Sequence, residues 1–68
     1  MGDVYRVVVE GELSPRYAAV FEGMEMKCAQ GRTSFVGILK DQSHLQGLLQ
    51  RIAGLGLDLV SIERVNGS

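Results

Sequence analysis

Apolar and polar residues alternate along four stretches of this chain, a period that is typical of half-buried β-strands. The alternation predicts strands over residues 4–11, 24–29, 32–40 and 57–65. The first and third of these carry apolar residues on both faces, as the middle strands of a sheet do. Gln30-Gly31 predicts a tight hairpin turn between the second and third strands, because Gly31 can adopt a positive φ.

A short helix is predicted between the first two strands. Ser14-Pro15 is typical of a helix start, since the serine side chain caps free backbone N–H groups and proline fits the first helical position. Gly23 can supply the left-handed residue that ends this helix. Alternatively, Arg16 to Phe21 forms a strand, because Tyr, Val and Phe favour β structure.

A longer helix is predicted from Ser43 to Gly56. Ser43 and Gln46 have the spacing of a capping box, and Asp41 stands just before the positive end of the helix. Apolar residues recur at helical spacing and define a buried stripe. The stripe consists of Leu45, Leu48, Leu49, Ile52 and Leu55. Gly56 ends the helix, with Leu57 placed for the hydrophobic contact that follows such a cap.

The resulting order predicts an α+β domain, a ferredoxin-like β-α-β-β-α-β sandwich that spans residues 1–68 as a single unit. Its four-stranded antiparallel sheet carries two helices on one face. The other face then exposes an apolar surface, which on a small domain indicates self-association. That surface consists of Val8, Val36 and Ile38 with one row of the last strand, either Val60 and Ile62 or Leu59. We expect a homo-oligomer, since a chain with one cysteine has no internal disulfide to stabilise it.

The composition is that of an ordinary globular protein. Hydrophobic residues make up 46% of the chain and the net charge is −1. Without a basic patch or a polybasic run, we expect neither a nucleic-acid partner nor a membrane partner. The sequence shows no signal peptide and no membrane-spanning run, which predicts a cytoplasmic protein.

Few residues could carry chemistry. His44 is the only histidine, and no nucleophile or second ligand accompanies it, so we interpret it as an exposed, unpartnered side chain. Cys28 has no neighbouring base or second thiol, and we expect it to be buried beside Met24 and Met26. The sequence therefore predicts no catalytic residue, no metal site and no cofactor.

Residues 14–24, 31–37 and 41–49 resemble a widespread family of short uncharacterised prokaryotic proteins. The last of these stretches, with the pattern Asp-Gln-x-x-Leu-x-Gly-Leu-Leu, is the most specific. That family commonly has histidine at the position of Gln46, whereas here the histidine is His44, so a role of the family histidine does not transfer. The resemblance implies the predicted architecture and, because the family has no established activity, adds no function.

Two functions are compatible with these features. The first is a non-enzymatic small-molecule-binding or protein-interaction module that acts as a homo-oligomer, similar in architecture to ACT-type sensor domains. Those sensors bind effectors at subunit interfaces through the first strand-to-helix loop. The candidate ligand-binding residues are Gly11, Glu12, Ser14, Asp41 and His44. The second function is a small enzyme with an active site between subunits, using His44 and Asp41 of one subunit and a carboxylate such as Glu12 of another.

Overall fold

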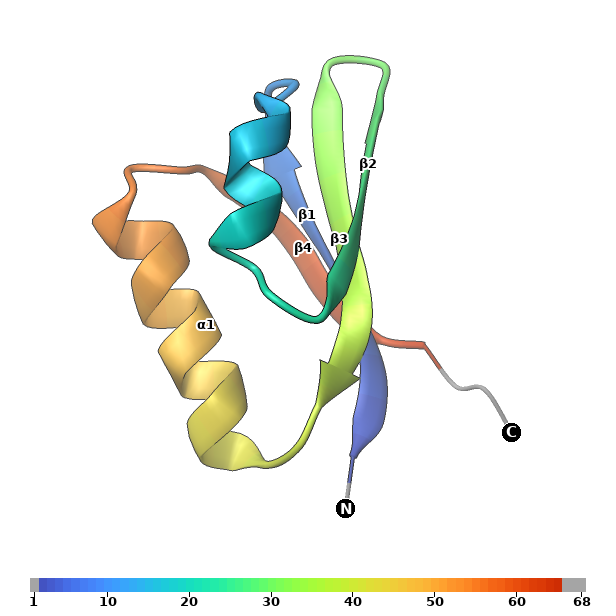
Figure 1. Ribbon diagram of the computed structural model, residues 1–68, viewed down its shortest axis with the longest axis vertical. Helices are drawn as coiled ribbons and strands as arrows, with labels where there is room; N and C mark the ends of the chain where they lie inside the picture. The colour runs from blue at the N-terminus through green and yellow to red at the C-terminus, as the bar shows by residue number, and fades with distance from the viewer. Residues whose placement is uncertain (1, 66–68) are drawn as a thin grey trace.

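The computed structural model describes residues 2–65, which form four strands, one α-helix and one short 3-10 helix. In chain order these are β1 (Asp3–Glu10), η1 (Pro15–Ala19), β2 (Met24–Ala29), β3 (Arg32–Leu39), α1 (Gln42–Gly54) and β4 (Leu59–Arg64). The strands form one antiparallel sheet in the order β2-β3-β1-β4. Both η1 and α1 lie on the same face of this sheet, here the front face, and the other is the rear face (Figure 1).

The two strands that were predicted to be central, β1 and β3, are indeed the inner strands of the sheet. On the front face, Val7 pairs with Phe35 and Val9 pairs with Thr33, and all four side chains are fully buried. Apolar side chains from the end of β3, from the connection between β1 and β2 and from α1 pack on this centre to complete the core. They are Phe21, Leu39, Leu48 and Ile52. The core therefore lies between the inner strands and the elements on the front face.

The turns that were predicted from glycine are confirmed. Gln30 and Gly31 both have a positive φ, 54° and 76°, as a two-residue hairpin of this kind requires. Gly56 has a φ of 73° directly after the end of α1. The next amide, of Leu57, donates to the carbonyl of Ile52 at 3.1 Å, which closes the helix with a Schellman motif.

The ferredoxin-like prediction with two helices is wrong, because the connection between β1 and β2 contains no α-helix. It forms a five-residue 3-10 helix instead. Ser14 does cap this helix, since its Oγ accepts from the amide of Arg16 at 3.4 Å. However, so short a segment gains little from helical hydrogen bonds, and Tyr17 and Val20 are weak helix formers, so a tighter 3-10 turn forms. The alternative of a strand over Arg16 to Phe21 is wrong as well.

Helix α1 begins earlier than predicted. Its N-cap is Asp41, whose Oδ1 accepts from the backbone amide of His44 at 2.8 Å. The predicted capping box of Ser43 and Gln46 is therefore wrong, because Ser43 already lies within the helix. A carboxylate at the N-cap satisfies a free amide and also interacts favourably with the helix dipole, which explains why the aspartate takes this position.

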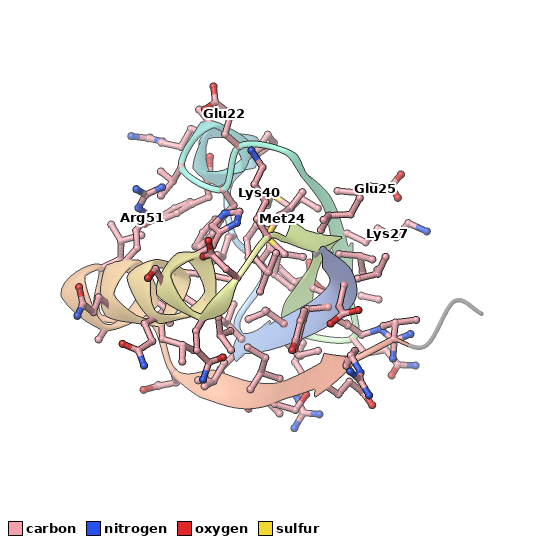
Figure 2. All side chains as sticks on the ribbon, turned by 90° about the horizontal axis from the view of Figure 1, so that it is seen from below. Glu22, Met24, Glu25, Lys27, Lys40 and Arg51 are labelled. Carbon is pink, nitrogen blue, oxygen red and sulfur yellow. The ribbon has the colours of Figure 1, made fainter. Side chains whose placement is uncertain are left out.

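The rear face is less apolar than predicted. Val8 and Val36 are half-buried and Ile38 is 58% exposed, but charged side chains stand between them. Arg6, which pairs with Val36 across the strands, forms an ion pair with Glu63 at 3.2 Å. On β2, the charged side chains of Glu25 and Lys27 extend from the edge of the sheet, away from α1 (Figure 2).

Neither row that was predicted for the last strand lies on the rear face. Ile62 pairs with Val7 and therefore faces the core. The position opposite Val8 is Ser61, so β4 contributes Ser61 and Glu63 to the rear face. A register shift between Val8 and Val9 marks a bulge in this strand pair, and alternation alone does not reveal where such a bulge falls.

The apolar stripe of α1 yields a stability prediction. Leu48 is buried, whereas Leu55, at the end of the same stripe, is 41% exposed. Leu48→Ala should lower the free energy of unfolding by about 2–5 kcal/mol, the usual cost of truncating a buried leucine. Leu55→Ala should cost less, about 1 kcal/mol, because its side chain is already partly in contact with water. Urea unfolding followed by circular dichroism measures both, and equal losses would contradict the packing described.

Candidate functional site

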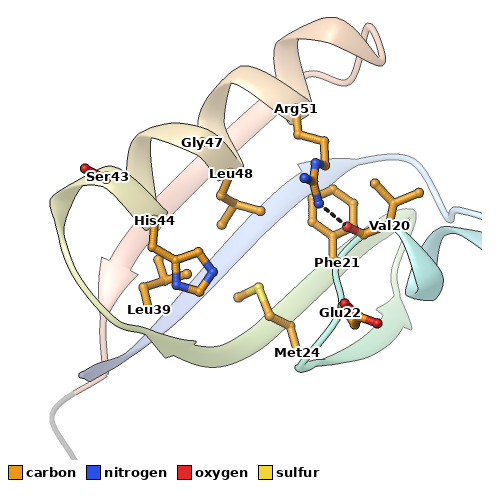
Figure 3. Close-up of a pocket in the computed structure, with 10 residues that line it drawn as sticks. All are labelled: Val20, Phe21, Glu22, Met24, Leu39, Ser43, His44, Gly47, Leu48 and Arg51. Carbon is orange, nitrogen blue, oxygen red and sulfur yellow. Dashed lines mark hydrogen bonds between the residues drawn. The ribbon is translucent and has the colours of Figure 1, made fainter. Parts of the chain in front are cut away.

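A cleft of about 350 Å³ opens on the front face between α1 and the connection from η1 to β2. One wall consists of Val20, Phe21 and Glu22, the end of the segment that was predicted to be a second α-helix. The floor of the cleft is apolar and consists of Phe21, Met24, Leu39 and Leu48, while His44 and Arg51 stand on the α1 side (Figure 3). An apolar hollow of this size with a few polar groups is typical of small-molecule sites.

Arg51 connects the two walls of the cleft. Its Nη1 donates to the backbone carbonyl of Val20 at 2.7 Å, so the last turn of α1 is joined to the residue that follows η1 (Figure 3). The guanidinium carries four further N–H groups. The hydrogen bond therefore holds the group in place and leaves donors at the edge of the cleft.

His44 is exposed, as predicted, but it is not unpartnered. Its Nδ1 accepts from the backbone amide of Lys40 at 3.0 Å. In the neutral imidazole the proton then resides on Nε2, which becomes a hydrogen-bond donor. The ring lies against the cleft on the side of Leu39 (Figure 3).

The structure does not combine His44 and Asp41 into an acid–base pair. The carboxylate of Asp41 accepts from the backbone amide of His44, while the imidazole is bonded to the amide of Lys40. Each side chain thus stabilises the start of α1. Within residues 2–65, no group of three His, Cys, Asp or Glu side chains is placed to hold a metal ion.

Gly47 lines the same cleft from the middle of α1. A Cβ built at this position would meet no atom within 4 Å. Glycine in the interior of a helix costs stability relative to most residues. Its effect here is to leave open space above the apolar floor.

The other predicted ligand-binding residues lie elsewhere. Gly11, Glu12 and Ser14 belong to the loop after β1, which Figure 1 shows at the opposite end of the sheet from the start of α1. There, the amide of Gly11 donates to the carbonyl of Gly31 at 2.7 Å, and a carboxylate oxygen of Glu12 accepts from the amide of Gly31 at 3.0 Å. The loop is therefore fastened to the β2–β3 hairpin and does not contribute to the cleft.

Thr33 anchors that loop and was not singled out from the sequence. Its hydroxyl is fully buried, accepts from the amide of Leu13 at 2.9 Å and donates to the carbonyl of Gly11 at 2.7 Å. The only signal in the sequence is a threonine at an inward position of an apolar strand. Nearby, Cys28 is exposed rather than buried as predicted, because it lies near the open end of the edge strand, with its Sγ 3.5 Å from the hydroxyl of Thr33.

The comparisons with known proteins give a family. A family model described as a domain of unknown function (DUF8691) matches residues 4–63, which is most of the chain. The match is consistent with the resemblance to short uncharacterised proteins. No curated protein and no solved structure matches the chain. No helix within residues 2–65 is long and apolar enough to cross a membrane.

The bonds of Thr33 can be tested by substitution. Thr33→Val keeps the shape but leaves the Leu13 amide and the Gly11 carbonyl without a partner, which should cost about 1–3 kcal/mol for each group that stays buried. Thr33→Ser keeps the hydroxyl and should lose only the methyl contribution, about 1 kcal/mol. Hydrogen exchange of the Leu13 amide should accelerate in the valine variant alone. Equal exchange in both variants would show that the hydroxyl does not hold the loop.

Proposed function

Since this chain belongs to the DUF8691 family, whose description gives no function, we propose from the geometry that the domain is a non-enzymatic binding module. In this proposal it acts as a homo-oligomer and takes a small molecule in the cleft between η1 and α1. The observation that carries the proposal is the make-up of that cleft, an apolar floor beside positioned hydrogen-bond donors.

The chemistry of the walls indicates the class of ligand. Phe21, Leu39 and Leu48 offer an apolar surface to a compact aromatic or branched body. A carboxylate at the Arg51 end of the cleft gains charge-assisted hydrogen bonds from the free guanidinium N–H groups. His44 Nε2–H offers a second donor roughly 10 Å away along α1, seven residues earlier in the chain. Glu22 also borders the cleft and repels a second negative charge. The favoured ligand is thus a small monocarboxylate with an apolar body.

No contact among the described residues favours the alternative, a small enzyme. His44 and Asp41 are bonded to backbone amides and not to each other. A general base needs to reach a proton of its substrate, usually with a third group to orient it. In the cleft, the contacts of His44 position it as a hydrogen-bond donor.

The homo-oligomer rests on the size and surface of the domain. A chain of 68 residues buries a modest fraction of its surface. Ile38 is 58% exposed on the rear face, and both edges of the sheet are open in the described part of the chain. Several statements stay predictions from the sequence. They are the rear-face interface of Val8, Val36 and Ile38, the prokaryotic origin and wide distribution of the family, and the cytoplasmic location.

Two helical glycines provide a matched test of the cleft. Gly47 lines the cleft and Gly54 does not, and a Cβ has open space at both positions. Replacing either with leucine should raise stability by roughly 0.5–1 kcal/mol, because glycine is a poor helix former. Only Gly47→Leu should fill the cleft.

We expect calorimetry with 2-naphthoate, an aromatic monocarboxylate, to show saturable binding to the wild-type chain and to Gly54→Leu. Gly47→Leu should weaken this binding by roughly tenfold or more, since a side chain would occupy the site of the apolar body. Arg51→Gln should weaken it while Arg16→Gln, on η1 and outside the cleft, should not. Equal binding by both leucine variants, or none by the wild-type chain, would contradict the proposed site.

A further inference from the structure

We propose that two copies of this domain join along their β2 edge strands, in an antiparallel register that sets Met26 opposite the partner's Met26. The inference rests on the proposed homo-oligomer and names its interface. The two four-stranded sheets would then form one continuous sheet related by a twofold axis, the commonest symmetry of soluble dimers.

The β2 edge is open and regular. β2 is an outer strand, and Figure 1 shows no element beyond it. All six of its residues pair in unbroken register with β3. The opposite edge strand, β4, contains a register shift in its pairing with β1. Bulges twist an edge away from further pairing, so β2 is the edge that is suited to accept another strand.

Two charged residues of β2 lack an ion-pair partner within residues 2–65. Glu25 and Lys27 are exposed, and the three ion pairs of the described chain involve other residues. Both side chains extend from the free edge on the side opposite to α1 (Figure 2). They lie on the same face of the sheet, two residues apart, on either side of Met26.

Symmetry restricts how two such strands can pair. A twofold axis normal to the sheet keeps each face with itself, so only residues of the same face can stand opposite each other. With Met26 on the axis, Glu25 stands opposite the partner's Lys27, and this pair occurs twice. On the core-facing side, Met24 stands opposite the partner's Cys28, which adds apolar contacts.

The neighbouring registers are unfavourable. With Glu25 on the axis, it would face the partner's Glu25, and with Lys27 on the axis, it would face the partner's Lys27. Opposite charges directly across two strands stabilise the pairing, and like charges destabilise it. The order Glu25-Met26-Lys27 is therefore self-complementary in one register and repulsive in the registers on either side.

Charge reversal tests this interface by sedimentation equilibrium. Glu25→Lys alone places two lysine pairs opposite each other, and Lys27→Glu alone places two glutamate pairs there. Each should raise the dimer dissociation constant by roughly tenfold or more, because two attractions become two repulsions. The double variant that exchanges the two residues should associate like the wild-type chain. An equimolar mixture of the two single variants should form a heterodimer, since one strand is then basic and the other acidic.

Ile38→Glu is the control variant on the rear face. Thermal unfolding should show that every variant stays folded, because the replaced side chains are exposed. A wild-type chain that stays monomeric at millimolar concentration would overturn both the proposed homo-oligomer and this interface. The wild-type chain could instead form a dimer that is lost in Ile38→Glu and kept in the charge-reversal variants. That result would overturn the β2 interface alone. Loss of association in both single variants, with recovery in the double variant and in the mixture, is the result we expect.

Discussion

The packing of Phe21 on Phe35 is the contact on which the front face of this domain depends. The two rings lie with their centroids 4.1 Å apart, and Phe21 is the buried residue of the connection between β1 and β2. It fixes that connection over β3, although the connection forms a 3-10 helix in place of an α-helix. Gly37 permits the close return of the chain, because a Cβ there would lie 2.7 Å from Cγ of Met24. The front face is thus only partly covered, and the cleft lies between this connection and α1.

The cleft therefore follows from the fold and not from a separate set of functional residues. Its floor is the core itself, since Phe21, Leu39 and Leu48 are buried there and also line the cleft. The bond from Arg51 to the carbonyl of Val20 joins the two walls at 2.7 Å. A ligand that contacts the floor would add apolar burial to a domain of marginal size, so binding and stability should be coupled.

The sheet could be predicted from the sequence because local patterns determine it. Apolar residues on both faces placed β1 and β3 at the centre, and Gly31 and Gly56 take the positive φ that their turns require. The η1 segment could not be predicted, because Ser14-Pro15 starts a 3-10 helix as readily as an α-helix. Of the five predicted ligand-binding residues, His44 lines the cleft. Arg51 and Gly47 could not be identified as cleft residues from the sequence. Their role depends on how far α1 lies from η1, and no local pattern encodes that distance.

The partly covered front face is the proposed small-molecule site, and the other proposals about the ligand depend on it. The most direct measurement is an NMR titration of protein labelled with ¹³C in its methyl groups, with 2-naphthoate as the ligand. We expect saturable chemical-shift changes at the methyl groups of Met24, Leu39 and Leu48, while the methyl signals of Val36 and Ile38 on the rear face stay unchanged. Chemical-shift changes that spread over both faces without saturation, or that are confined to the rear face, would contradict the proposed site.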